Sequence, residues 1–262
     1  MRKFEIWGKN SEKLLRELGI EHAFFYEETD STNVRAKAFH SERADLKHGM
    51  AIFVADYQTS GRGTRSRSFE SPRGAGLYIS FLFYPDMLAS EAAKITTYAA
   101  VTVRRALSRL GADPKIKWVN DIYLGDKKIS GILTEGAAGT DGRLEYAIVG
   151  IGINIRKGAL SPELADIAAS LEDFGVLTDR DSLAYIICEE FFSSLDSLGS
   201  EKIMDEYRLE SMLVGRRVKI ITASGEKYAT VLGIDADGAL ITDDESGKRE
   251  RHLSADVSIK LN

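Results

Sequence analysis

The residues whose chemistry stands out most form a basic, glycine-containing stretch at positions 61–69. It holds three arginines, Arg62, Arg65 and Arg67, together with two glycines and a terminal aromatic residue. Glycine lets backbone N–H groups turn toward a ligand, and arginine forks match the oxygens of phosphates and carboxylates. No apolar period of a strand or a helix runs through the stretch. It therefore predicts a loop that closes on an anion, with a solvated basic loop and a nucleic-acid patch as the alternatives.

Two buried strands are expected to hold this loop. Residues 49–55 (GMAIFVA) and 77–84 (LYISFLFY) are short, nearly continuous apolar runs, a pattern typical of strands buried on both faces. Binding loops are commonly held on a rigid scaffold of this kind. The flanking strands therefore favour a binding loop over a free surface loop.

A second polar cluster precedes a predicted helix at residues 34–39. Asp30, Ser31 and Thr32 all suit the N-cap position of a helix. Capping uses only part of their hydrogen-bonding capacity. The spare hydroxyls and the Asn33 amide can therefore also meet a polar ligand at the N-terminus of the helix.

Downstream of a long predicted helix lies a predicted hairpin. Residues 116–124 (IKWVNDIYL) predict one strand with a polar interruption at Asn120 and Asp121, and residues 128–135 (KISGILTE) return as its partner. Gly131 marks a place in the partner strand where a side chain would obstruct.

The next predicted strand, residues 144–154, ends in the sequence GIGIN. Gly150 and Gly152 allow a ligand to lie against the backbone there. The pattern is not a dinucleotide-binding fingerprint, because the third glycine is missing and no helix follows at once. The chain also has no Walker A sequence, so a nucleotide would bind without the two commonest phosphate loops.

The hydrophobic pattern of the chain changes after residue 160. Residues 161–213 have a helical pattern, and beyond them short apolar segments alternate with glycine turns, which indicates a small barrel. We therefore expect a domain boundary near Val214, dividing the chain into domains 1–213 and 214–262. The strands predicted in the second domain are 217–221, 228–235, 239–243 and 257–261.

Composition narrows the class of protein. The net charge of −5 argues against nucleic acid as the main partner, because phosphate binding normally needs a basic face. The single cysteine, Cys188, lies in an apolar run and is expected to be a core thiol, as in a reducing cytosol. No run approaches the roughly 18 apolar residues of a membrane span, and the N-terminus lacks a signal-peptide core. We therefore expect a soluble, cytoplasmic protein without a membrane partner.

Five motifs together resemble the biotin protein ligases. The match covers nearly the whole chain, in the order of the family, and includes a small barrel at its end. The motifs are Ser31-Thr32-Asn33, Gln58-Thr59-Ser60-Gly61-Arg62-Gly63 through Arg67, Lys117-Trp118-Val119-Asn120-Asp121, residues 128–133 (KISGIL) and residues 150–154 (GIGIN).

The resemblance implies an α+β fold, with a mixed sheet flanked by helices as in class II synthetases and biotin–lipoate ligases, followed by an SH3-like β-barrel. It implies a cytoplasmic enzyme that joins biotin and ATP, with Mg²⁺, into biotinyl-5′-AMP. The biotinyl group then passes to a lysine of the biotin carboxyl carrier protein domain of acetyl-CoA carboxylase or a related carboxylase. Family members often dimerise, so a homodimer is expected. The Ser31 motif comes too early for the winged helix of repressor relatives, which implies a monofunctional form without DNA binding.

The resemblance also assigns residues. Lys128 matches the catalytic lysine, expected to contact the biotin carboxylate and the α-phosphate, and Arg62 matches an arginine near the same oxygens. The residues implied for biotin binding are Ser31, Thr32, Asn33, Gln58, Gly61, Arg62, Gly63, Thr64, Lys128, Gly131, Gly150 and Gly152. The residues implied for ATP binding are Arg62, Arg65, Arg67, Lys117, Trp118, Asn120, Asp121, Lys128 and Asn154. Asp121 is also the nearest carboxylate for the metal, which we expect to bind mainly to the phosphates. The alternative for Asn120 and Asp121 is that they only break the strand.

The basic loop departs from the usual pattern of the family. Thr64 stands where arginine is usual, and Ser66 stands where glycine is usual. Arg65 carries a positive charge at the next position, but its side chain is expected to point in a different direction. The sequence therefore predicts that this chain releases the adenylate more readily than relatives that keep the arginine.

Three alternative functions remain at this point. A lipoate or octanoate protein ligase of the same superfamily would keep the adenylation chemistry and change the acid. A non-catalytic biotin sensor would keep the binding site alone, and a nucleic-acid protein would use the basic loop. The net charge disfavours the last, and Lys128 disfavours the sensor.

Overall fold

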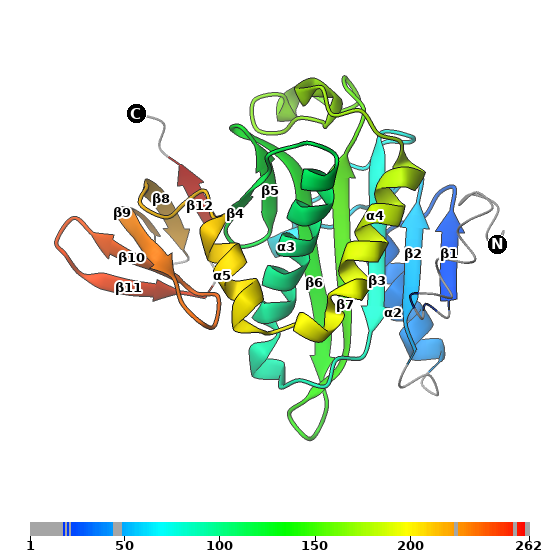
Figure 1. The fold of residues 1–262 in the computed structure, drawn as a ribbon, viewed down its shortest axis with the longest axis horizontal. Coiled ribbons are helices and arrows are strands. Elements are labelled where there is room, and N and C mark those ends of the chain that lie inside the picture. The colour runs from blue at the N-terminus through cyan, green and yellow to red at the C-terminus, as the bar shows by residue number, and fades with distance from the viewer. Residues whose placement is uncertain are drawn as a thin grey trace.

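The computed structural model describes Leu18, Ile20 and residues 22–43, 49–222, 225–253 and 256–259. A seven-stranded sheet forms its centre, in the order β1-β2-β3-β7-β6-β5-β4 (Figure 1). The β1–β2 pair is parallel and the other pairs are antiparallel, so the sheet is mixed, as expected. Its strands are β1 His22–Tyr26, β2 Ala51–Ala55, β3 Gly76–Phe83, β4 Lys115–Lys117, β5 Asp121–Leu124, β6 Lys127–Ala138 and β7 Leu144–Asn154.

Helices cover both faces of the sheet. In Figure 1, α3 (Ala93–Arg109) and α4 (Arg180–Ser193) cross its front, α5 (Glu201–Leu209) follows near β4, and α2 (Thr32–Glu42) lies behind β2 and β3. The single-turn 3₁₀ helices are η1 Thr64–Ser66, η2 Ala89–Glu91, η3 Pro162–Leu164, η4 Glu172–Phe174 and η5 Leu195–Ser197.

The apolar runs predicted as buried strands are confirmed. All residues of β2 and β3 are buried, because each strand is covered on both faces. Alternate residues point to opposite sides, so Ile52 and Val54 join the large core under α3 and α4, whereas Phe53 joins the smaller core under α2. Cys188 lies in the large core, as expected, and burial raises the pKa of its thiol.

The prediction of a single strand over residues 116–124, interrupted only at Asn120 and Asp121, is wrong. Residues 118–120 form a turn between β4 and β5, which pair with each other in an antiparallel hairpin. The reason lies outside the segment. The Trp118 indole donates to the Gly238 carbonyl oxygen at 2.8 Å, and the Tyr207 hydroxyl donates to the Val119 carbonyl oxygen at 2.8 Å.

A second, five-stranded antiparallel sheet follows α5, in the order β11-β10-β9-β8-β12, and fits an SH3-like domain. Sequence reasoning missed β11, whose sequence is RERH. Three of its four residues are charged and only His252 is buried, so no apolar alternation marks the strand. The domain boundary near Val214 stays a prediction. The strands are β8 Arg217–Thr222, β9 Gly225–Ile234, β10 Leu240–Asp244, β11 Arg249–His252 and β12 Asp256–Ile259.

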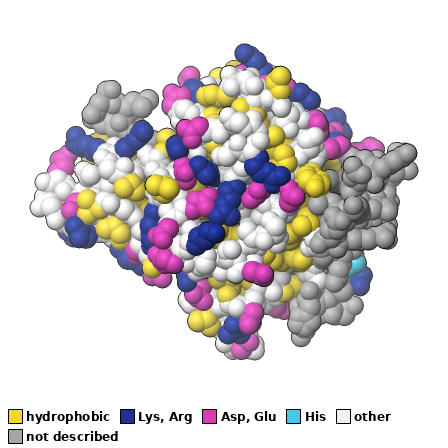
Figure 2. Space-filling model, in the orientation of Figure 1, with side chains coloured by type: hydrophobic (Ala, Val, Ile, Leu, Met, Phe, Trp, Pro, Cys, Tyr) yellow, Lys and Arg dark blue, Asp and Glu magenta, His cyan; other side chains and the backbone are white. Residues whose placement is uncertain are grey.

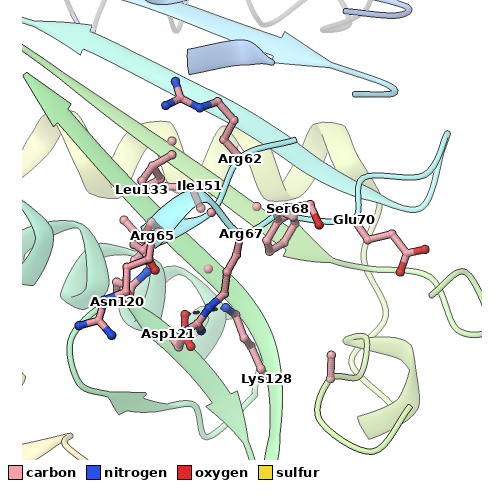
Figure 3. A pocket seen from close by; sticks show the side chains of 18 of the residues that line it. Arg62, Arg65, Arg67, Ser68, Glu70, Asn120, Asp121, Lys128, Leu133 and Ile151 are labelled. Carbon is pink, nitrogen blue, oxygen red and sulfur yellow. Dashed lines mark hydrogen bonds and ion pairs between the residues drawn. The ribbon is translucent and has the colours of Figure 1, made fainter. Parts of the chain in front are cut away.

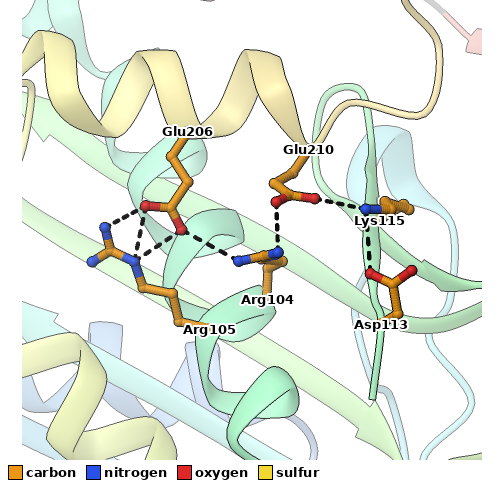
Figure 4. Close-up of polar contacts among 6 residues, drawn as sticks. All are labelled: Arg104, Arg105, Asp113, Lys115, Glu206 and Glu210. Carbon is orange, nitrogen blue, oxygen red and sulfur yellow. Dashed lines mark hydrogen bonds and ion pairs between the residues drawn. The ribbon is translucent and has the colours of Figure 1, made fainter. Parts of the chain in front are cut away.

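Ion pairs join the helical layer to the edge of the central sheet. On the face seen in Figure 2, basic and acidic side chains are interspersed. Figure 4 shows part of this pattern, in which Glu206 of α5 pairs with Arg105 of α3 at 2.5 Å. Glu210 bonds both Arg104, at 2.5 Å, and Lys115 of β4, at 2.8 Å. This network fixes α5 against the strand that leads into the Trp118 turn.

Among the described residues, no helix is both long and apolar enough to span a membrane.

Candidate active site

A cavity of about 690 Å³ opens where the loop between β2 and β3 lies over β6 and β7 (Figure 3). It brings together nearly every residue that the sequence assigned to ligand binding. The predicted residues that line it are Ser31, Thr32, Asn33, Gln58, Arg62, Gly63, Thr64, Arg65, Arg67, Lys117, Trp118, Asn120, Asp121, Lys128, Gly131, Gly150, Gly152 and Asn154.

A buried polar cluster forms one end of the cavity. Ser31 occupies the N-cap position of α2, but its side chain makes no capping hydrogen bond. The Gln58 side-chain oxygen instead accepts from the Thr32 backbone N–H at 2.8 Å, across 26 positions of sequence. The Ser80 hydroxyl lies 2.7 Å from the Thr32 hydroxyl and 2.6 Å from the Asn33 amide oxygen. Sequence reasoning missed Ser80, because it stands inside an apolar strand.

The glycines of β7 leave room for side chains of the protein itself. A Cβ atom at Gly150 would lie 2.2 Å from the Asn33 amide oxygen, and one at Gly152 would lie 2.4 Å from the Phe69 ring. Any larger residue at either position would therefore force Asn33 or Phe69 to shift. The two glycines therefore allow Asn33 and Phe69 to form walls of the cavity.

The basic loop is itself a small hairpin. Arg62 pairs with Ser68, and the Gly63 N–H donates to the Arg67 carbonyl oxygen at 2.7 Å. Arg65 takes the left-handed conformation, with φ of 56°, which non-glycine residues seldom adopt. Gly61 was predicted to bind ligand, but it lies outside the cavity lining, and a Cβ atom there would be 2.3 Å from the Phe69 carbonyl oxygen. Its visible role is to let the two arms of the hairpin approach closely.

Lys128 faces the cavity and forms an ion pair with Asp121, with 2.7 Å between the ammonium nitrogen and a carboxylate oxygen. Figure 3 shows the Arg67 side chain reaching toward the same pair. The Lys128 backbone is held by the chain that follows β7, through hydrogen bonds to Ile167 and Ala169.

Arg62 and Lys128 both line the cavity, but the structure does not bring their charged groups together. The Arg62 guanidinium points away from Lys128 (Figure 3) and pairs with Glu135 of β6 at 3.0 Å. Glu135 itself was not among the predicted site residues.

The turn at residues 118–120 forms the opposite wall. The Asn120 side-chain amide donates to the Ile132 carbonyl oxygen at 2.6 Å, which fixes the turn to β6. Asn120 thus both interrupts the strand and lines the cavity, whereas Asp121 lines the cavity as the first residue of β5. The Lys117 ammonium lies 3.2 Å from the Tyr123 hydroxyl, and burial, reinforced by the nearby Asp121, raises the pKa of Tyr123 to about 12.

Apolar residues from two distant segments complete the lining. Leu160, Leu164, Ile167 and Ala168 come from the connection after β7, and Ile221 and Val257 come from the second sheet. Sequence reasoning assigned none of them to the site, and it placed Ile221 and Val257 only in predicted strands of the small barrel. Within the described part of the chain, no three histidine, cysteine or acidic side chains gather into a group that could hold a metal ion.

Two family models match the chain. Residues 25–154 match the biotin/lipoate A/B protein ligase family, and residues 213–260 match the biotin protein ligase C-terminal domain. The bifunctional ligase/repressor BirA of Bacillus subtilis is 32% identical over an alignment of 264 positions, which covers 96% of this chain and 80% of the relative. The chain belongs to the biotin protein ligase family.

Other members of the family are similar over most of their length. The biotin–[acetyl-CoA-carboxylase] ligase of Paracoccus denitrificans is 29% identical over 84% of this chain and 94% of its own. The biotin protein ligase of Aquifex aeolicus, solved in complex with biotin and ATP, superposes with a TM-score of 0.75 at 26% identity, covering 93% of this chain and all of that one.

Proposed function

We propose that this biotin protein ligase activates biotin with ATP and transfers it to a lysine of a carrier protein. In the first step a carboxylate oxygen of biotin attacks the α-phosphorus of ATP, and pyrophosphate leaves. In the second step the amine of the carrier lysine attacks the carbonyl carbon of biotinyl-5′-AMP, and AMP leaves. The observation that supports this proposal is a single cavity with a neutral polar cluster at one end and Lys128, beside the arginine hairpin, at the other.

The polar cluster suits the ureido ring of biotin. Ser31, Thr32 and Gln58 offer hydroxyl and amide groups inside a mostly apolar slot, which is the usual composition of a small-molecule site. Asn33 and Phe69, held against the glycines of β7, shape the slot around the ring. We therefore assign this end of the cavity to biotin.

The other end suits the reacting anions. The biotin carboxylate and the α-phosphate repel each other, and fixed cations in a site that excludes water lower that barrier. Lys128 and Arg67 supply positive charge there, and Lys117, Trp118 and Asn120 provide a wall for the nucleotide. We assign this end to ATP, with Asn154 beside it.

Asp121 is the carboxylate best placed to help hold a Mg²⁺ ion carried by the phosphates of ATP. That metal prefers oxygen ligands and retains several waters, so one carboxylate beside the phosphates suffices. When bound, Mg²⁺ supplies further positive charge to the phosphates. Asp121 also forms an ion pair with Lys128 at 2.7 Å.

The hairpin has a second task, which is containment. Biotinyl-5′-AMP is a mixed anhydride that water or any exposed lysine can attack. A loop closed over it keeps it in place until the carrier domain of a carboxylase docks. We also propose the division near Val214, with catalysis in the first domain, and a homodimer as the assembled form.

The test is biotin-dependent exchange of pyrophosphate into ATP. Lys128→Ala should lower this exchange by about a hundredfold or more, the usual effect of removing one group that stabilises developing charge. Lys94→Ala is the matched control, because Lys94 is also a partly buried, ion-paired lysine but lies outside the cavity. Exchange that survives Lys128→Ala, or that runs with lipoate in place of biotin, would contradict the proposal.

A further inference from the structure

Glu135 lies behind the cavity wall, on β6, and contacts two residues of the site. Its carboxylate pairs with the Arg62 guanidinium at 3.0 Å and accepts a hydrogen bond from the Asn33 side-chain amide at 2.8 Å. Glu135 does not itself line the cavity, and its side chain is 25% exposed. It can therefore influence bound ligands only through the residues that it holds.

The Arg62 contact places a positive charge away from the place where the proposed chemistry needs it. Lys128 and Asp121 lie at one end of the cavity. The Arg62 side chain points away from them (Figure 3), toward Glu135, which lies farther along β6. An arginine that meets the carboxylate of biotin must first leave Glu135. Because the Arg62 side chain is 48% exposed, the pair is weak enough for a ligand anion to displace it.

Building on the proposed function, we propose that Glu135 is a positioning residue that competes with the biotin carboxylate for Arg62. In the empty protein the internal carboxylate holds the guanidinium and keeps the hairpin close to β6. When biotin binds, its carboxylate takes the place of Glu135, and Arg62 moves toward Lys128. Glu135 thereby weakens binding of the acid while keeping the hairpin ordered in its absence.

The Asn33 contact offers a different role, in which Glu135 only orients the polar cluster. Asn33 also donates to the Leu133 carbonyl oxygen at 3.3 Å, and its own oxygen lies 2.6 Å from the Ser80 hydroxyl. In that role a change at Glu135 would affect the ring of biotin and not its carboxylate. The two roles therefore predict different responses to ligands that share the ring and differ in the acid.

The experiment compares biotin with biotinol, its alcohol analogue, by titration calorimetry on the full chain. Glu135→Gln keeps an oxygen for Asn33 and removes the charge that holds Arg62. Biotin should then bind about two- to fivefold more tightly, the range of a partly exposed ion pair, and biotinol should bind as before. Glu189→Gln is the matched control, because Glu189 forms an ion pair of similar exposure with Arg109 outside the cavity.

Arg62→Ala provides the second arm. In the Arg62→Ala protein, adding Glu135→Gln should change the affinities for biotin and biotinol equally. An equal change for both ligands, weaker binding of biotin to Glu135→Gln, or a preference that persists without Arg62 would each overturn the inference. If the unchanged protein binds no biotin at all, the proposed function fails instead.

Discussion

The two cations that the sequence assigned to catalysis, Lys128 and Arg62, are each held by an acid of the same chain. Lys128 pairs with Asp121 at 2.7 Å, and Arg62 pairs with Glu135 at 3.0 Å. Partly exposed pairs of this kind contribute at most about 1 kcal/mol, because water screens them. Substrate oxygens can therefore replace the internal carboxylates at little cost. We therefore expect bound substrate to redirect both charges from the internal carboxylates to its own oxygens.

A second prediction at the scale of single residues concerns Thr64 and the release of the adenylate. Thr64 lines the cavity at the position where the family resemblance leads us to expect arginine. A charge-assisted hydrogen bond contributes roughly 1.5–3 kcal/mol, so Thr64→Arg should slow release of the adenylate by about 10- to 150-fold. The measurement is labelling of a bystander protein in a mixture of enzyme, ATP and biotin.

Thr59→Arg is the control for this experiment, because it adds the same charge to an exposed position of the same loop, outside the cavity lining. Bystander labelling that stays unchanged in Thr64→Arg would show that the missing arginine does not matter in this chain.

At the scale of elements, β7 contributes to the site through a glycine. Because Gly152 has no side chain, the Phe69 ring can lie against the strand, and this contact fixes the end of the basic hairpin. The hairpin and the strand therefore form one unit, although Phe69 and Gly152 are 83 positions apart in the sequence. A change in the strand should act through the loop.

Gly152→Ala tests that coupling. Its Cβ atom would lie 2.4 Å from the Phe69 ring, so the ring must move. Such overpacking typically costs about 1–3 kcal/mol, and biotin binding should weaken by about 5- to 150-fold in calorimetry. Adding Phe69→Ala should restore part of the affinity.

Gly233→Ala, in β9, is the matched control, because no atom lies within 4 Å of its Cβ position. Full affinity in Gly152→Ala would mean that the ring is not part of the biotin site.

At the scale of the whole molecule, the second sheet is joined to the active site and not merely attached to the chain. Ile221 and Val257 line the cavity, and the Trp118 indole donates to the Gly238 carbonyl oxygen at 2.8 Å. The Arg208 guanidinium of α5 donates to the Ile234 carbonyl oxygen at 2.8 Å. The Trp118 contact lies at the turn that we assign to ATP, so the second sheet should affect ATP more than biotin.

Trp118→Phe tests this expectation, because it keeps an aromatic wall and removes the donor to Gly238. Loss of one hydrogen bond costs about 1 kcal/mol, so the KM for ATP in the exchange assay should rise about fivefold while biotin affinity stays constant. Tyr185→Phe, which removes a partly exposed hydroxyl on α4, should change neither value. An equal loss of biotin affinity would argue against the separation of the two ends.

The sequence by itself determined the strands that carry local apolar patterns and the loop between β2 and β3. Through the family resemblance of its motifs, it also gave more than half of the residues that line the cavity. The strands and the loop follow from composition and spacing over a few positions, which a linear pattern records, whereas the site residues follow from the resemblance to the family. Only the tertiary structure decided that residues 118–120 form a turn, that Arg62 pairs with Glu135, and that the second sheet reaches the cavity. Trp118 and Gly238 stand 120 positions apart, and their hydrogen bond leaves no periodicity in either segment. Contacts of that kind depend on how the two sheets pack, so they become visible only in three dimensions.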